Sequence, residues 1–144
     1  MPVSLGPATP DCFPDILSFW LTATEVPSST DDLAGLTTLW EHDPEAVVVA
    51  RHEDAIVGTL ITTWDGWRGG FYRLAVHPRY RGQGIGRMLV AHGEGRLRRL
   101  GARRLSFFAV ASHDGAVAFW RRLGYQPDPE DLRFVRNLAP PGND

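Results

Sequence analysis

The sequence predicts one mixed α/β domain of 144 residues. Segments with apolar residues at helical spacing alternate with short runs of strand length that are rich in Val, Ile and Thr. The composition, 43% hydrophobic and 22% charged, is typical of a globular protein, and the chain shows neither a repeat nor a linker. We therefore expect a single domain over residues 1–144.

Two helices are expected after a short strand at residues 3–5. The segment 11–24 has apolar residues on one helical face, and Thr9 or Asp11 precedes it as a capping residue. A second amphipathic helix is expected to start at Thr30 or Asp31 and to run to about His42. The side chains of this part that we expect in the core are Cys12, Phe19, Trp20 and Trp40.

Three strands are expected next. The run 46–50 is continuously apolar, and the segment 55–64 is rich in β-branched residues. Asp65-Gly66 is a hairpin signal, so the chain is expected to return as a strand over 71–76.

The last part of the chain alternates between helices and strands. Apolar residues lie on one face of a helix over 84–100, which Gly101 ends. The remaining expected elements are a strand over 105–110, a helix over 114–123, a strand over 132–138 and a frayed tail over 139–144.

Several classes of protein are excluded by composition. No apolar run approaches the roughly 20 residues of a membrane span, and the N-terminus does not resemble a signal peptide. The single cysteine excludes an intrachain disulfide, and the histidines lack the spacing of metal ligands, so no metal is expected. We expect a cytoplasmic protein without membrane contact.

The basic residues are unusual because all 15 are arginines. The absence of lysine excludes Walker-type phosphate loops, Schiff-base enzymes and pyridoxal-phosphate enzymes. Residues 1–67 hold eleven acids and one arginine, whereas residues 68–104 hold ten arginines and one acid. The basic segment indicates an anionic ligand. The alternative is that several of these arginines only solvate a helix and its exit loop, namely Arg96, Arg98, Arg99, Arg103 and Arg104.

The stretch 74–87, LAVHPRYRGQGIGR, has the pattern of an anion site. A strand ends before Pro78, and a glycine-rich loop then opens a helix. Backbone N–H groups at a helix N-terminus, with arginines around them, favour a pyrophosphate. A Rossmann dinucleotide site is not expected, because the spacing is G-x-G-x-G and the loop does not follow the first strand of the chain.

This stretch resembles the coenzyme A-binding motif of the GNAT superfamily of N-acetyltransferases, Q/R-x-x-G-x-G/A, which falls on Arg81, Gly84 and Gly86. The segment 112–125, SHDGAVAFWRRLGY, is similar to the second signature of that family, and the order of elements also matches. The resemblance implies the GNAT acyl-CoA N-acyltransferase fold, a mixed, mostly antiparallel sheet flanked by helices. Its fourth and fifth strands are expected to splay apart.

The resemblance also implies how acetyl-CoA binds. The pantetheine arm is expected on main-chain groups of Leu74, Ala75 and Val76, with the Val76 amide stabilising the developing oxyanion. His113 stands where the family often has a cofactor-contacting asparagine, although a surface histidine is an equal alternative. The pyrophosphate is expected on Arg81, Gly82, Gln83, Gly84, Ile85, Gly86 and Arg87.

The proton-transfer residues depart from the family pattern. Trp120, which is also expected among the cofactor-binding residues, stands where many members have a tyrosine acid, and an indole N–H is a poor acid. Neither the fourth nor the fifth strand carries a glutamate base. Asp65, Tyr72 and Tyr125 are the candidates from elsewhere, although Asp65 is first of all a turn residue. Otherwise the amine arrives neutral or loses its proton through water, and proximity supplies most of the catalysis.

The predicted function is transfer of acetyl from acetyl-CoA to a primary amine by direct attack, with a small-molecule or peptide acceptor. The acidic N-terminal part favours a cationic acceptor. One alternative is a non-catalytic acyl-CoA-binding or sensing module. A nucleic-acid partner is not expected, because no aromatic and basic surface motif accompanies the arginines. The sequence leaves the oligomeric state, including a homodimer, open.

Overall fold

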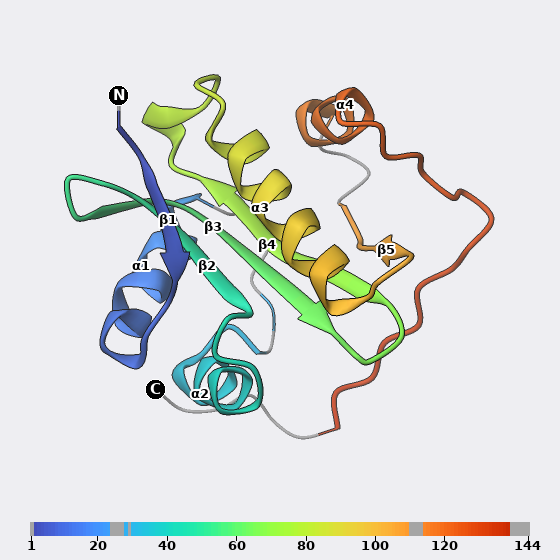
Figure 1. Cartoon of the computed structure of the whole chain (residues 1–144), viewed down its shortest axis with the longest axis horizontal. Coiled ribbons are helices and arrows are strands. Elements are labelled where there is room, and N and C mark those ends of the chain that lie inside the picture. The colour runs from blue at the N-terminus through green and yellow to red at the C-terminus, as the bar shows by residue number, and fades with distance from the viewer. Residues whose placement is uncertain (1, 24–27, 29, 110–113, 139–144) are drawn as a thin grey trace.

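A five-stranded mixed sheet forms the centre of the molecule (Figure 1). The computed structural model describes residues 2–23, 28, 30–109 and 114–138. The strands lie in chain order, antiparallel from first to fourth, and the fifth is parallel to the fourth. They are β1 (Ser4–Pro7), β2 (Val47–His52), β3 (Ala55–Trp64), β4 (Gly69–Val76) and β5 (Leu105–Ser106).

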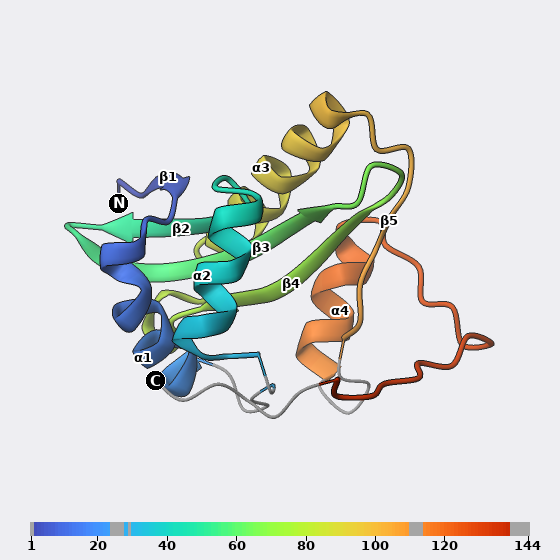
Figure 2. The same cartoon turned by 90° about the horizontal axis from the view of Figure 1, so that it is seen from below.

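Helices cover both faces of this sheet (Figure 2). Alternation along the strands divides the core, because Val47 and Val49 face the first two α-helices, whereas Val48 and Ala50 face the third. No helix of the described residues is both long and apolar enough to span a membrane. The helices are η1 (Pro10–Cys12), α1 (Phe13–Ala23), α2 (Leu33–His42), η2 (Pro78–Tyr80), α3 (Ile85–Leu100) and α4 (Asp114–Arg122).

The strands β4 and β5 meet only at their first residues. Gly69 pairs with Leu105 and Gly70 with Ser106, and within the described residues no further pair follows. Gly69 allows a close approach of α3, because a Cβ there would lie 2.7 Å from Leu97 Cδ1. Beyond this point the two strands diverge, as expected from the family resemblance.

The boundaries of several predicted elements need correction. The first predicted helix is divided into η1 and α1, and Thr9 makes no side-chain capping bond to it. The second helix begins at Leu33 instead of residue 30 or 31, because the Asp32 side chain caps it by accepting from Gly35 N–H at 2.7 Å. The predicted tail 139–144 lies outside the described residues.

Two strand predictions at the C-terminal end are wrong. The strand predicted over 105–110 ends at Ser106, because β5 leaves β4 there and loses its hydrogen-bonding neighbour. The segment 132–138 is not a strand, although its apolar residues alternate. Alternation produces a strand only where another strand offers an edge to pair with, and Leu132 and Phe134 are instead 79% and 89% exposed.

The predicted core residues of the N-terminal part are confirmed. Cys12, Phe19 and Trp20 are buried, and Trp40 is partly buried. The hypothesis that Arg96 only solvates its helix is wrong. This arginine is 8% exposed and donates to both carboxylate oxygens of Asp43 and to Thr62. An ion pair of this kind satisfies a buried guanidinium that would otherwise destabilise the fold.

Candidate active site

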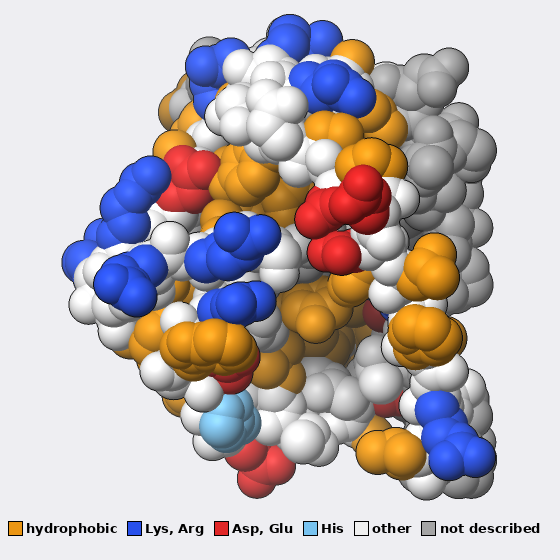
Figure 3. All heavy atoms as spheres, turned by 90° about the vertical axis from the view of Figure 1, so that its right-hand side faces the viewer, with side chains coloured by type: hydrophobic (Ala, Val, Ile, Leu, Met, Phe, Trp, Pro, Cys, Tyr) orange, Lys and Arg blue, Asp and Glu red, His pale blue; other side chains and the backbone are white. Residues whose placement is uncertain are grey.

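A cleft of about 1040 Å³ opens where β4 and β5 diverge. Its walls come from β4, the loop before α3, the first turn of α3, residues 107–109 and α4. Figure 3 shows that the face formed by β5, α4 and the segment after α4 is hollowed, with hydrophobic side chains inside the hollow. The charged residues among the described lining are all arginines, namely Arg73, Arg81, Arg87 and Arg122.

The glycine loop at one end of the cleft has the backbone of an anion cradle. Gly82 and Gly84 have φ values of +78° and +86°, a left-handed conformation that favours glycine. A Cβ at either position would meet nothing within 4 Å, so the loop surface is open. Gly84 is the N-cap of the 16-residue helix α3, whose first N–H groups and Arg87 add positive potential.

Two predicted residues of this loop have other surroundings. Gln83 is not among the lining residues, and its side chain donates to Arg79 O at 3.4 Å. Gly86 lines the cleft, but a Cβ there would lie 3.2 Å from Phe119 of α4. The third glycine of the motif therefore allows α4 to approach α3.

The backbone of Val76 faces the cleft. Opposed residues of an antiparallel pair alternate between exchanging two hydrogen bonds and exchanging none. His77 N–H donates to Val57 O at 2.8 Å, so the neighbouring pair of Val76 and Gly58 exchanges none, and Val76 turns its N–H and C=O away from β3. By the same alternation, Ala75 turns its backbone groups toward Thr59 of β3.

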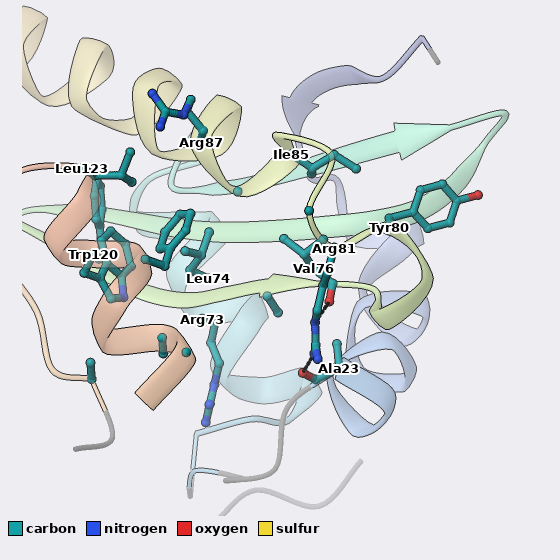
Figure 4. A pocket seen from close by; sticks show the side chains of 18 of the residues that line it. Ala23, Arg73, Leu74, Val76, Tyr80, Arg81, Ile85, Arg87, Trp120 and Leu123 are labelled. Atoms are coloured by element: carbon teal, nitrogen blue, oxygen red, sulfur yellow. Dashed lines mark hydrogen bonds between the residues drawn. The ribbon is translucent and has the colours of Figure 1, made fainter. Parts of the chain in front are cut away.

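Arg81 connects the end of β4 with the end of α1 (Figure 4). Its Nε donates to Val76 O at 3.1 Å, and its Nη2 donates to Ala23 O at 3.2 Å. A guanidinium has several donors in a fixed plane, which suits it to bridging two carbonyls. The first residue of the resemblance motif thus positions backbone around the cleft.

The wall formed by α4 is aromatic. Trp120 lines the cleft, and its ring centroid lies 4.1 Å from that of Phe107 and 5.2 Å from that of Phe119. Phe71 of β4 stacks on Phe107 and on Trp120. The position that often carries a tyrosine acid in the family is therefore occupied by a packed indole.

The three candidates for proton transfer are separated in space. Tyr72 lines the cleft and is 58% exposed. Tyr125 is not among the described lining residues, and its hydroxyl donates to Glu94 of α3 at 2.5 Å. Burial, followed by this hydrogen bond, raises the pKa of Tyr125 well above its ordinary value of 10.0.

Asp65 lies in the hairpin between β3 and β4, where its carboxylate accepts from the N–H groups of Arg68 and Trp67 at 2.7 and 2.8 Å. These bonds lower the pKa of Asp65 below its ordinary value of 3.8. Asp65 is not among the described lining residues, so its observed contacts are those of a turn residue.

Several site residues were missed by the sequence reasoning. Arg73, Phe107 and Arg122 line the cleft, and Tyr80 lines it while its hydroxyl contacts His52 Nδ1 at 3.2 Å. The arginine-rich charge of residues 68–104 was a signal for Arg73, but not for its position. His113 lies outside the described residues. Within the described ranges, no group of three or more His, Cys, Asp or Glu is arranged to hold a metal.

Known proteins are similar to this chain in sequence and in fold. The model of the acetyltransferase (GNAT) family matches residues 13–125, so the chain belongs to this family. Acetyltransferase SG1711 of Sodalis glossinidius is 28% identical over 128 residues, which cover 89% of this chain and 90% of the relative. Acetyltransferase plu1384 of Photorhabdus laumondii is 28% identical over 129 residues, with coverage of 89% and 90%.

Two solved structures show the same fold. The PaiA N-acetyltransferase of Thermoplasma acidophilum, solved in complex with coenzyme A, has a TM-score of 0.77 at 12% identity, covering 91% of this chain and 94% of its own. The ribosomal-protein-S18-alanine N-acetyltransferase of Escherichia coli has a TM-score of 0.69 at 21% identity, with coverage of 85% and 77%. At these identities the likeness shows the fold alone.

Proposed function

We propose that this protein transfers an acetyl group from acetyl-CoA to a primary amine. The observation that carries the proposal is the placement of the outward-facing Val76 backbone beside the loop with left-handed Gly82 and Gly84. A hydrogen-bonding strand edge suits the amide groups of a pantetheine arm, and the loop suits a diphosphate. The complex of PaiA with coenzyme A supports the choice of ligand.

The residues of the cleft fit coenzyme A. N–H groups at the open positions Gly82 and Gly84 and in the first turn of α3 would bind the diphosphate, with the guanidinium of Arg87 nearby. The Val76 C=O, which accepts one bond from Arg81 Nε, would accept an N–H of the pantetheine arm on its second lone pair, and the arginine-only charge of the lining suits the phosphates of coenzyme A. Acetyl-CoA, when bound, supplies an activated thioester.

The chemical roles that we assign belong to two residues. The Val76 N–H would stabilise the negative charge that develops on the thioester carbonyl oxygen. Tyr72, the candidate that lines the cleft, would donate a proton toward the leaving sulfur or relay one from the amine. The remaining rate enhancement comes from holding amine and thioester together in direct attack.

The acceptor is a small-molecule or peptide amine. The described lining offers no carboxylate, and Arg81, Arg87 and Arg122 add positive charge beside the ion-paired Arg73, which does not support the cationic acceptor expected from the acidic N-terminal part. We therefore expect a panel to favour neutral or anionic amines over polycationic ones, because like charges in the cleft repel a cation.

Calorimetry with coenzyme A and thiol release against an amine panel test the proposal. We expect Gly84→Ala to weaken coenzyme A binding, because a Cβ strains the left-handed N-cap of α3. Gly101→Ala is the matched control, since Gly101 has φ +107° and open space at the other end of the same helix. We expect it to cost similar stability and to leave binding unchanged.

The outcomes separate the alternatives. Binding of coenzyme A without thiol release on any amine would favour a sensing module over an enzyme. Wild-type protein without affinity for coenzyme A, or equal loss of binding in both variants, would contradict the proposed site.

A further inference from the structure

Arg73 is the residue at which β4 departs from regular pairing. Tyr72 faces Ile61 and Ala75 faces Thr59, so Arg73 and Leu74 together face the single residue between them on β3. Arg73 has φ +53°, in the left-handed region that non-glycine residues rarely adopt. Such a conformation persists only where its surroundings stabilise it.

The carbonyl of Arg73 is held by a buried pair of side chains. Thr59 Oγ1 donates to Arg73 O at 2.9 Å, and Trp20 Nε1 donates to Thr59 Oγ1 at 2.9 Å. Thr59 is fully buried, and Trp20 is 4% exposed. The bulge of β4 is therefore connected to β3 and α1 through the hydrogen bonds of the buried Thr59 hydroxyl.

The guanidinium of Arg73 is held by Asp31, which precedes α2. Nε donates to Oδ1 at 3.0 Å and Nη2 to Oδ2 at 2.5 Å, with the two side chains 18% and 16% exposed. Asp31 is itself fixed in a turn, since its N–H donates to Ser28 O at 3.1 Å and its Oδ2 accepts from Ser28 N–H at 3.0 Å. A two-point pair of this kind fixes direction as well as distance.

We propose that Asp31 is a positioning residue for acetyl transfer, acting through Arg73 on the β4 bulge; the inference rests on the proposed function. The bulge comes directly before residues 74–76, and the Val76 N–H is the proposed oxyanion donor. Contacts at both the carbonyl and the guanidinium of Arg73 determine where the bulge places that N–H. A small displacement of such a group lowers the rate much more than it lowers binding.

The chain contains a matched control pair. Arg96 donates to both oxygens of Asp43, with an Nη2–Oδ2 distance of 2.5 Å and side chains 9% and 22% exposed. This pair joins α3 to the C-cap of α2, and neither residue is among the described lining of the cleft. Asp43→Asn thus makes the same chemical change in a similar burial, away from the cleft.

The test compares Asp31→Asn with Asp43→Asn in the full chain. We expect both variants to lower the melting temperature. Only Asp31→Asn should lower kcat, by about 10- to 100-fold, with little change in KM for acetyl-CoA, because the diphosphate loop is untouched. Arg73→Gly, which relaxes the left-handed backbone but lacks the side chain, should be as slow as Asp31→Asn.

If Asp31→Asn does not fold, Arg73→Lys replaces it in the test. This variant keeps the positive charge and one contact with Asp31, so its kcat should fall less than that of Arg73→Gly. Equal kcat in Asp31→Asn and wild type, or an equal fall in Asp43→Asn, would overturn the positioning role while leaving the enzyme intact. A wild type inactive on every amine would instead overturn the proposed function. In that case amide hydrogen exchange over residues 71–77 tests whether Asp31 positions the bulge. Faster exchange in Asp31→Asn alone would support this role, and equal exchange in Asp31→Asn and Asp43→Asn would overturn it.

Discussion

Tyr72 and Tyr125 carry the same hydroxyl group in different surroundings. Tyr72 is more than half exposed and lines the cleft, so its hydroxyl is accessible to a substrate. The hydroxyl of Tyr125 is already committed to Glu94, and the raised pKa of Tyr125 keeps it protonated. Of these two phenols, only Tyr72 has the access that proton transfer needs.

We expect Tyr72→Phe to lower kcat by about 100-fold, the low end of what positioned proton transfer contributes. Tyr125→Phe is the control, because it removes one hydrogen bond and about 1 kcal/mol of stability while it keeps the ring that packs on Phe107 and Trp120. Thiol-release rates and urea unfolding measure the two effects. An unchanged kcat in Tyr72→Phe would show that water, and not Tyr72, carries out the proton transfer.

At the scale of elements, α3 lies across the sheet because a glycine permits it. A Cβ at Gly93 would lie 2.8 Å from Phe71 Cε1 and 2.9 Å from Thr62 Cγ2. At Gly95, two residues later, the nearest atom would be Arg99 Nη1 at 3.4 Å. Both glycines weaken the isolated helix, but only Gly93 sets its distance from the strands.

We expect Gly93→Ala to destabilise the protein by about 1–3 kcal/mol, because overpacking outweighs the gain in helix propensity. Gly95→Ala should instead stabilise it by up to about 1 kcal/mol. Urea unfolding of the two variants measures both changes. A stability change of the same sign in both would show that α3 tolerates displacement from the sheet.

At the scale of the whole molecule, charge is divided along the chain and gathers where a ligand would bind. The arginine-rich segment 68–104 forms β4, the glycine loop and α3. Four arginines line the cleft, and three of them come from this segment. Such a field attracts an anion over several ångströms and is weakened by salt.

We expect KM for acetyl-CoA to rise with ionic strength, because the screening length falls from about 30 Å at 0.01 M to about 3 Å at 1 M. The acetyl thioester of N-acetylcysteamine lacks the phosphates and should show little change. Steady-state thiol release with both donors measures this difference. If the KM values of both donors depended equally on salt, the salt effect would come from a change in the protein and not from screening of the phosphates.

Local patterns predicted most of the fold. The apolar run at 46–50, the hairpin at Asp65-Gly66 and the glycine ends of α3 all depend on neighbouring residues, and the structure confirms them within a few positions. The prediction of a strand over 132–138 was wrong, because a strand forms only beside the edge of another strand, and that edge depends on residues distant in the sequence. The hypothesis that Arg96 is a solvated surface residue was wrong, because its ion-pair partner Asp43 lies 53 residues earlier in the sequence.

The candidate site was predicted unevenly for the same reason. The glycine loop is a contiguous motif, so its residues were found together. Arg73 was missed because a left-handed arginine has no local signature and its contacts come from Trp20, Thr59 and Asp31. The role of such a residue depends on three elements that meet only in the folded structure, so the sequence of one segment does not predict it.

The order of the strands has a consequence for folding. β2, β3 and β4 are joined by short turns within residues 47–76, so this meander closes small loops at low entropic cost. β5 pairs with Gly69 and Gly70 across all the residues that include α3, so this contact closes a much longer loop. A ligand in the cleft therefore bridges a meander built from local contacts and a strand that joins it through a long-range contact.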